Sequence, residues 1–163
     1  MSSSLEGRLA AYIAERLDAA RDVAVDSLSR ISGGASRQTF RFRLLWTDAG
    51  GRTNERRLIL RRDPPASLID TERRIEFEAY RAFHGSSVPV PQMLWLEEAS
   101  DALDHPFFIA EEICGFQAGP GLLFAEPYVS TLAQLGRRKW TILGDIAKAD
   151  PADLGLDQVM TSV

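Results

Sequence analysis

The spacing of apolar residues predicts one amphipathic helix followed by a run of strands. Within residues 5–24, apolar side chains recur every three or four positions, which is the period of a helix that buries one face. Three segments follow that are rich in β-branched residues or alternate in polarity, separated by glycine-containing turns; they cover residues 23–32, 37–46 and 54–62. We expect these three strands to pair as an antiparallel meander.

The rest of the chain contains further predicted helices and strands. Prolines and glycines separate these elements, because proline cannot continue a helix or a strand ladder and the residue before it avoids helical geometry. The predicted ranges are, in order, a helix from Asp70 or Thr71 to about Phe83, strands over residues 93–98 and 107–113, and a helix over residues 128–148.

This order of elements predicts an α+β fold. We expect a five-stranded antiparallel sheet with one packed helix, preceded by an amino-terminal helix and followed by a linker and a helix. The corresponding division is a first domain over residues 1–113, a hinge or linker over 114–127, and the first part of a second lobe over 128–163. The apolar face of the last helix must pack on the sheet, on chain not present here, or on another subunit.

The composition favours a soluble globular protein. Apolar residues make up 45% and charged residues 26% of the 163 positions, which excludes a disordered or collagen-like chain. The net charge of −4 argues against nucleic acid as a partner, because phosphate contacts need clustered Lys and Arg. The chain has no apolar run of about 18 residues, no signal-peptide pattern and only one cysteine, Cys114, so we expect no membrane partner and a cytoplasmic location.

A glycine-rich break between the first two strands is the first candidate site. Gly33, Gly34 and Ser36 fall within it. Adjacent glycines allow backbone N–H groups to turn toward an anion, and a serine hydroxyl adds a donor, as a nucleotide phosphate requires. A hairpin turn that needs positive φ explains the same residues, and this alternative remains open.

An arginine at the end of the third strand and an acid on the following helix form the second candidate. Because strand side chains alternate, Arg61 shares a face with Ile59, and Arg62 points to the other face. Arg61 could hold a phosphate, or both arginines could be solvated at a strand end. Glu76 lies at the edge of an apolar helix stripe and needs a cationic partner, which is either Arg61 or the nearby Arg73.

Two other patterns favour structural interpretations. Asp145 and Asp150 have the spacing of a kinase catalytic loop, but the neighbouring residues do not fit and the segment favours a helix. His84, His105 and Cys114 do not have the spacing of metal ligands, so we expect no metal site.

The order of these segments resembles the amino-terminal lobe of the aminoglycoside phosphotransferase and choline kinase-like family, which has the protein-kinase fold. The resemblance covers about residues 25–115 and rests on the segments 31–40, 58–65, 76–83, 88–91 and 106–115, while residues 143–156 resemble the first helix of that family's carboxyl lobe. It implies that Gly33, Gly34 and Ser36 cover the phosphates of ATP and that Ile59 roofs the adenine. It also implies that Arg61 replaces the strand-three lysine of kinases and pairs with Glu76.

The resemblance further implies that the Glu111 carbonyl and the Ile113 amide hold the adenine edge. The family's catalytic loop and Mg²⁺ ligands would lie in the carboxyl lobe, beyond Val163, so we expect no catalytic residue here and an inactive chain. The expected partners are ATP and, in a complete enzyme, a small-molecule substrate whose hydroxyl is phosphorylated. The alternative is a non-catalytic kinase-like binding module, and the last helix could mediate self-association.

Overall fold

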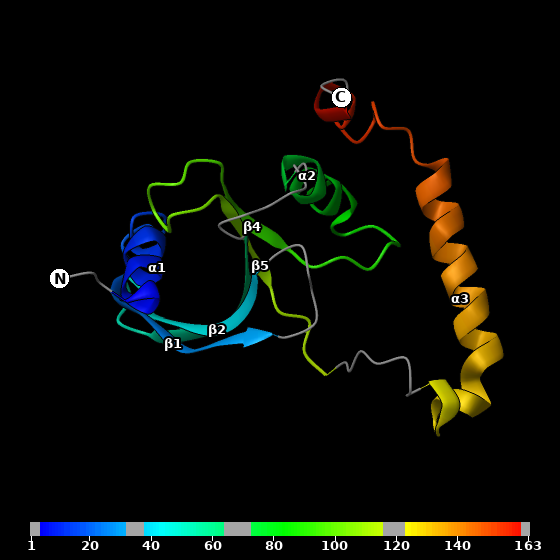
Figure 1. The fold of residues 1–163 in the computed structure, drawn as a ribbon, viewed down its shortest axis with the longest axis horizontal. Coiled ribbons are helices and arrows are strands. Elements are labelled where there is room, and N and C mark those ends of the chain that lie inside the picture. Colours follow the sequence, from blue (N-terminus) through cyan, green and yellow to red (C-terminus); the bar gives the residue numbers. More distant parts are fainter. Residues whose placement is uncertain (1–3, 32–37, 64–72, 116–122, 161–163) are drawn as a thin grey trace. The chain divides into compact units, whose positions relative to one another are not determined.

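The computed structural model of the chain describes residues 4–31, 38–63, 73–115 and 123–160. Figure 1 shows the arrangement of its helices and strands. The elements are, in order, α1 (Leu5–Ala14), β1 (Arg21–Ile31), β2 (Gln38–Thr47), β3 (Thr53–Arg62), α2 (Arg73–Phe83), β4 (Met93–Glu97), β5 (Phe107–Glu111), α3 (Tyr128–Lys148) and α4 (Asp157–Met160). This order confirms the α+β fold predicted from the sequence.

The chain divides into two compact units. The first consists of Met1–Phe77 and Gln92–Glu112, and the second consists of Glu78–Pro91 and Ile113–Val163. The first unit therefore holds the whole sheet, α1 and the first residues of α2. The second unit holds α3, α4 and the segment that follows the middle of α2.

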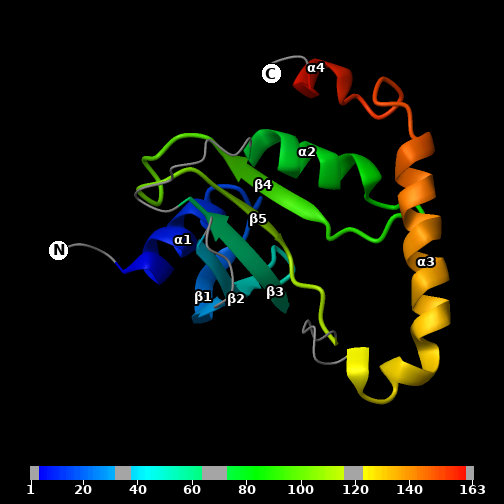
Figure 2. The ribbon, with the colours of Figure 1, turned by 45° about the vertical axis from the view of Figure 1, so that its right-hand side comes forward.

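The five strands form one antiparallel sheet in the order β1-β2-β3-β5-β4 (Figure 2). The first three strands are the meander expected from the sequence, and β3 pairs with β5 through partners that include Ile59 with Ala110 and Arg61 with Phe108. The turn between β2 and β3 uses Gly51 at φ +80, a left-handed conformation that glycine adopts without steric cost. β3 is therefore a central strand, with paired neighbours on both sides.

The main hydrophobic core lies between α1 and one face of the sheet. Leu9 and Ile13 of α1 are fully buried, as are Leu58 and Leu60 of β3. Phe107 and Ile109 of β5 are buried in the same cluster. The amino-terminal helix thus supplies a large part of the core, and it buries the apolar face that its sequence period predicted.

The first helix is shorter than the predicted range of residues 5–24. α1 ends at Ala14, the chain turns at Ala19 with φ 53, and β1 begins at Arg21. Leu17 nevertheless packs against the core from this turn. The apolar period therefore continued beyond the helix because a turn, rather than further helix, brings Leu17 to the core.

The other element boundaries agree closely with the predicted ranges. α3 spans the residues expected, β5 ends at Glu111 rather than at Ile113, and the short helix α4 was not expected. The start of α2 was predicted at Asp70 or Thr71, which lie outside the described residues. Among the described helices, none is both long enough and apolar enough to cross a membrane.

Within the second unit, α3 carries many exposed apolar side chains. None of its residues is buried, and Trp140 is 69% exposed. A hydrogen bond of 2.7 Å from the Ser87 hydroxyl to Asp145 connects the segment after α2 to α3. Asp145, one of the two acids with catalytic-loop spacing, thus lies on a helix.

Candidate functional site

β3 presents two different faces, as the alternation of its side chains requires. Leu58 and Leu60 point into the core and are fully buried. Ile59 and Arg61 point to the opposite face, where both are partly buried. The candidate residues of this strand therefore lie on the side of the sheet away from α1.

Arg61 and Glu76 form an ion pair in the first unit. The Nη1 group of Arg61 donates a hydrogen bond to Oε1 of Glu76 in the first turn of α2. The side chains remain 32% and 24% exposed, so the pair is only partly shielded from water. Of the two partners that the sequence left open for Glu76, the structure shows Arg61.

A second ion pair joins the same two elements. Arg73, the first residue of α2, donates to the carboxylate of Asp63, directly after β3. These side chains are 13% and 18% exposed. Two guanidinium–carboxylate contacts therefore fasten the first turn of α2 to the end of β3, and this attachment orients Glu76 toward Arg61.

Aromatic contacts support this arrangement from β5. The guanidinium of Arg61 lies 5.6 Å from the ring centroid of Phe108, within the range of a cation–π interaction. The rings of Phe77 and Phe108 pack edge to face with centroids 6.1 Å apart. Phe108 therefore contacts both the strand arginine and the helix that carries its partner.

The Arg62 side chain lies on the opposite side of the sheet. Its guanidinium donates to the side-chain oxygen of Gln38 at 2.7 Å and to the carbonyl of Leu103 at 3.1 Å. Burial lowers its pKa from the ordinary value for arginine. Arg62 holds β2 and the β4–β5 loop, so the two adjacent arginines have different tasks.

One donor of Arg61 makes no hydrogen bond within the part of the chain that the structure describes. Its Nε group makes no hydrogen bond to any other part of the described structure, although it is buried. Guanidinium groups carry five N–H donors in a planar fork that matches phosphate oxygens. The contact of Nη1 with Glu76 thus leaves the Nε donor of Arg61 without a hydrogen bond among the described residues.

A second group of charges lies further along the same face. Arg41 of β2 and Arg57 of β3 both contact the carboxylate of Glu112, at 3.4 Å and 2.9 Å. Because β3 lies between β2 and β5, the Arg41 side chain crosses β3 to reach Glu112. The side chain of Glu112 is only 10% exposed.

These two groups of charges lie on either side of Ile59. Along β3, Arg61 lies two residues after Ile59 and Arg57 two residues before it, about 7 Å away in each direction. Across the sheet, Ile59 pairs with Ala110, a small residue on β5. The face thus presents a short apolar strip of Ile59 and Ala110, with Arg61 and Glu76 at one end and Arg57 and Glu112 at the other. We call this strip the Ile59 strip. Arg41 pairs with Ile59 from β2, and its side chain reaches Glu112 at that second end.

The backbone N–H groups after Ala110 alternate in direction, first away from β3 and then toward it. The N–H of Glu111 donates to the carbonyl of Gln92 at 2.9 Å, and the N–H of Glu112 donates to the carbonyl of Arg57 at 3.0 Å. The polar backbone groups of Glu111 thus face away from β3. Ile113 is the first residue after β5 that belongs to the second unit, and its side chain is exposed.

The structure brings together part of the predicted site. Ile59, Arg61 and Glu76 share one face of the first unit, and Glu111 ends the strand beside it. Gly33, Gly34 and Ser36 lie outside the described residues. The contributions of Phe108, Arg41 and Glu112 were missed, because only the strand register shows that they share a face with Ile59.

The described residues contain no group of His, Cys, Asp and Glu side chains suited to a metal ion. His84 is exposed in the turn after α2, His105 lies in the β4–β5 loop, and Cys114 is exposed.

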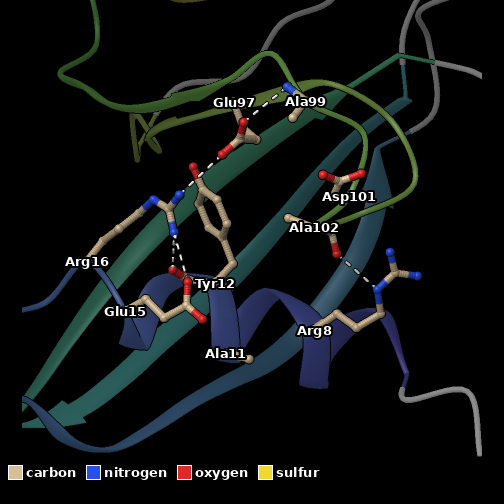
Figure 3. A pocket seen from close by; sticks show the side chains of 9 residues that line it. All are labelled: Arg8, Ala11, Tyr12, Glu15, Arg16, Glu97, Ala99, Asp101 and Ala102. Atoms are coloured by element: carbon tan, nitrogen blue, oxygen red, sulfur yellow. Dashed lines mark hydrogen bonds and ion pairs between the residues drawn. The ribbon is translucent and has the colours of Figure 1, made fainter.

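The first unit also has a hollow on its other side, between α1 and the β4–β5 loop (Figure 3). Its volume is about 510 Å³, and its lining includes Arg8, Tyr12, Arg16 and Glu97. Arg16 stacks over the Tyr12 ring at 3.5 Å and contacts Glu97 at 3.2 Å. Burial raises the pKa of Tyr12. Both arginines of this hollow pair with acids, because Arg16 contacts Glu97 and Arg8 binds Asp104. These contacts attach α1 to β4 and to the β4–β5 loop, and we call this attachment the seam.

An antiparallel sheet whose third strand carries a basic residue paired with a helix acid is the arrangement that the sequence resemblance implied. The chain matches the family model described as the phosphotransferase enzyme family, APH, over residues 27–161. The protein therefore belongs to this phosphotransferase family, as the sequence resemblance suggested.

A solved structure shows the same fold. It is described as a "putative aminoglycoside phosphotransferase" from Ralstonia eutropha JMP134, and it is 20% identical in sequence with a TM-score of 0.62. The match covers 93% of the present chain and 40% of that protein. The present chain thus spans less than half the length of this structural relative. Among curated proteins, no match was found.

Proposed function

We propose that the first unit is the ATP-binding lobe of a phosphotransferase that acts on a small molecule. The observation that carries the proposal is the pair of Arg61 and Glu76 beside the Ile59 strip. In this arrangement an anionic group and a flat ring have adjacent places on one sheet face. The family membership of the chain supports phosphoryl transfer as the reaction class.

Each end of the nucleotide has a proposed partner. Arg61 binds a phosphate oxygen through donors that it does not use for Glu76, and Glu76 holds the guanidinium in place. Ile59 covers the adenine ring, beside its pairing partner on β5, the small Ala110. The Glu111 carbonyl and the Ile113 N–H are proposed to hydrogen-bond the adenine edge, and Gly33, Gly34 and Ser36 to cover the phosphates.

In the complete reaction, ATP supplies the phosphoryl group that a substrate hydroxyl accepts. The role of this chain's residues is to bind and orient the nucleotide. The described residues do not form a carboxylate cluster for Mg²⁺. The proposed substrate is a small molecule with a hydroxyl group.

Titration calorimetry of the chain with ATP tests this proposal. Arg61→Ala should raise the Kd for ATP about tenfold or more, because a charged phosphate contact is lost. Arg74→Ala is the matched control: Arg74 is an exposed arginine on α2, two residues before Glu76, so the same charge is removed. The Kd of this control should stay within about twofold. Equal affinities for the two variants, or no ATP binding by the unchanged chain, would refute the proposal.

A further inference from the structure

The carboxylate of Glu112 connects three strands of the sheet at the edge of the Ile59 strip. It accepts contacts from Arg41 on β2 at 3.4 Å and from Arg57 on β3 at 2.9 Å, and it directly follows β5. The backbone N–H of Glu112 also donates to the carbonyl of Arg57 at 3.0 Å. Side chain and backbone thus attach the same residue to β3.

The burial of the three side chains is unequal. Glu112 is 10% exposed, whereas Arg41 is 50% and Arg57 is 52% exposed. A carboxylate that is taken out of water needs compensating charge and hydrogen bonds. Arg41 and Arg57 provide the charge, and Arg57 donates a hydrogen bond to Glu112 at 2.9 Å. The arginines keep much of their hydration. The cluster therefore holds the Glu112 side chain in place. Arg41 and Arg57 remain hydrated if the Glu112 carboxylate is removed.

The position of Glu112 in the chain gives this attachment a consequence. It lies between Glu111 and Ile113, the two residues whose backbone groups are proposed to bind the adenine edge. Because neighbouring residues of an extended strand point in opposite directions, anchoring Glu112 to β3 turns the polar groups of Glu111 away from β3. A backbone that is already held in this orientation loses less conformational freedom when a ring binds.

We propose that Glu112 is a positioning residue for base recognition. Its contacts with Arg41 and Arg57 hold the backbone of residues 111–113 in the orientation that receives the adenine edge, and the Arg41 side chain closes that end of the Ile59 strip. This inference rests on the proposed ATP-binding function. It assigns to Glu112 a role in binding the base and none in binding the phosphates.

The test compares ATP with inorganic tripolyphosphate, which carries a phosphate chain and no base. Glu112→Gln should raise the Kd for ATP about threefold to tenfold and leave the Kd for tripolyphosphate within about twofold. Arg61→Ala should weaken both ligands. Glu55→Gln is the matched control, because Glu55 lies on the same sheet face and pairs with Arg43 at 3.7 Å, and it has no ion pair with β5 among the described residues. This control should bind ATP like the unchanged chain.

A measurement without nucleotide tests the attachment itself. In Glu112→Gln, the amides of residues 111–113 should exchange with deuterium faster than in the unchanged chain, whereas Glu55→Gln should leave them unaltered. Unchanged exchange in Glu112→Gln would overturn the inference, as would equal losses of ATP and tripolyphosphate affinity. If Glu112→Gln matches Glu55→Gln for ATP while Arg61→Ala loses affinity, the positioning role is wrong and the proposed function stands. If Arg61→Ala matches Arg74→Ala, the proposed function itself fails.

Discussion

The guanidinium of Arg61 donates to the carboxylate of Glu76, fifteen residues away in sequence and on a different element. Arg61 belongs to the central strand β3, and Glu76 belongs to the first turn of α2. Since Phe108 contacts Arg61 from β5, the pair connects a helix and two strands. The contact thus determines both where α2 attaches and where a basic group faces the Ile59 strip.

Glu76→Gln should lower the free energy of unfolding by about 1 kcal/mol, as measured by urea denaturation. The reason is that the substitution removes the counter-ion of Arg61, although water partly screens the pair. Glu78→Gln on the same helix is the control, since Glu78 pairs with Arg81, which is 62% exposed, and contacts its Nε at 2.6 Å. That variant should change stability by less than about 0.5 kcal/mol. Equal effects would show that the Arg61 contact adds nothing to stability.

Leu60→Ala tests the core between α1 and the sheet. Leu60 is fully buried, so the substitution should leave a cavity and cost about 2–5 kcal/mol of unfolding free energy. Leu132→Ala is the matched control on α3, where the leucine is 46% exposed, and it should cost less than about 0.5 kcal/mol. Chemical denaturation of both variants gives the comparison. A small loss in Leu60→Ala would contradict the location of the core.

The sequence predicted the faces of β3 correctly, for a physical reason. Strand side chains alternate with a period of two, so placing Leu58 and Leu60 in the core necessarily places Ile59 and Arg61 on the other face. Turn signals located the meander, because glycine-containing segments separate its three strands in the sequence. Local patterns of this kind depend on the backbone alone and do not require knowledge of distant contacts.

Contacts between segments that are distant in the sequence were harder to predict. Arg41 reaches Glu112 across β3, and this contact depends on the strand order β2-β3-β5. β3 and β5 are neighbours in the sheet, although α2 and β4 lie between them in the sequence. The end of α1 was predicted too late in the sequence, because Leu17 packs against the core from a turn and not from a face of the helix. In both cases tertiary packing, rather than local periodicity, determined the result.

Asp104→Asn tests the seam that attaches α1 to the β4–β5 loop. Arg8 donates two hydrogen bonds to Asp104, at 2.7 and 2.8 Å, and these hold the pKa of Asp104 below its ordinary value of about 3.9. A lowered pKa in the folded state stabilises the fold above about pH 4. That contribution is lost as the pH falls through the folded-state pKa.

The expected result follows from this sign. As the pH falls below about 4, the stability of the unchanged chain should fall more steeply than that of Asp104→Asn, which no longer binds this proton. Thermal unfolding at a series of pH values measures the slopes. Asp101→Asn in the same loop is the control, because Asp101 is exposed and lines the hollow without a contact to Arg8 among the described residues. Equal slopes for the unchanged chain and Asp104→Asn would show that the contact between Arg8 and Asp104 does not cause the loss of stability at low pH.

Phe108→Leu tests whether the aromatic ring on β5 orients Arg61 for the nucleotide. The ring lies 5.6 Å from the Arg61 guanidinium, and a cation–π interaction at a partly exposed site contributes about 0.5–1 kcal/mol. Under the proposed function, the Kd for ATP should therefore rise about twofold to fivefold. Phe107→Leu is the matched control, because Phe107 points to the opposite face and packs on Tyr12 with ring centroids 4.8 Å apart. Both variants lose packing in a buried site, so the affinities are compared at a temperature where each is fully folded. A Phe107→Leu variant that loses as much ATP affinity as Phe108→Leu would mean that general loosening of β5, and not the orientation of Arg61, causes the change.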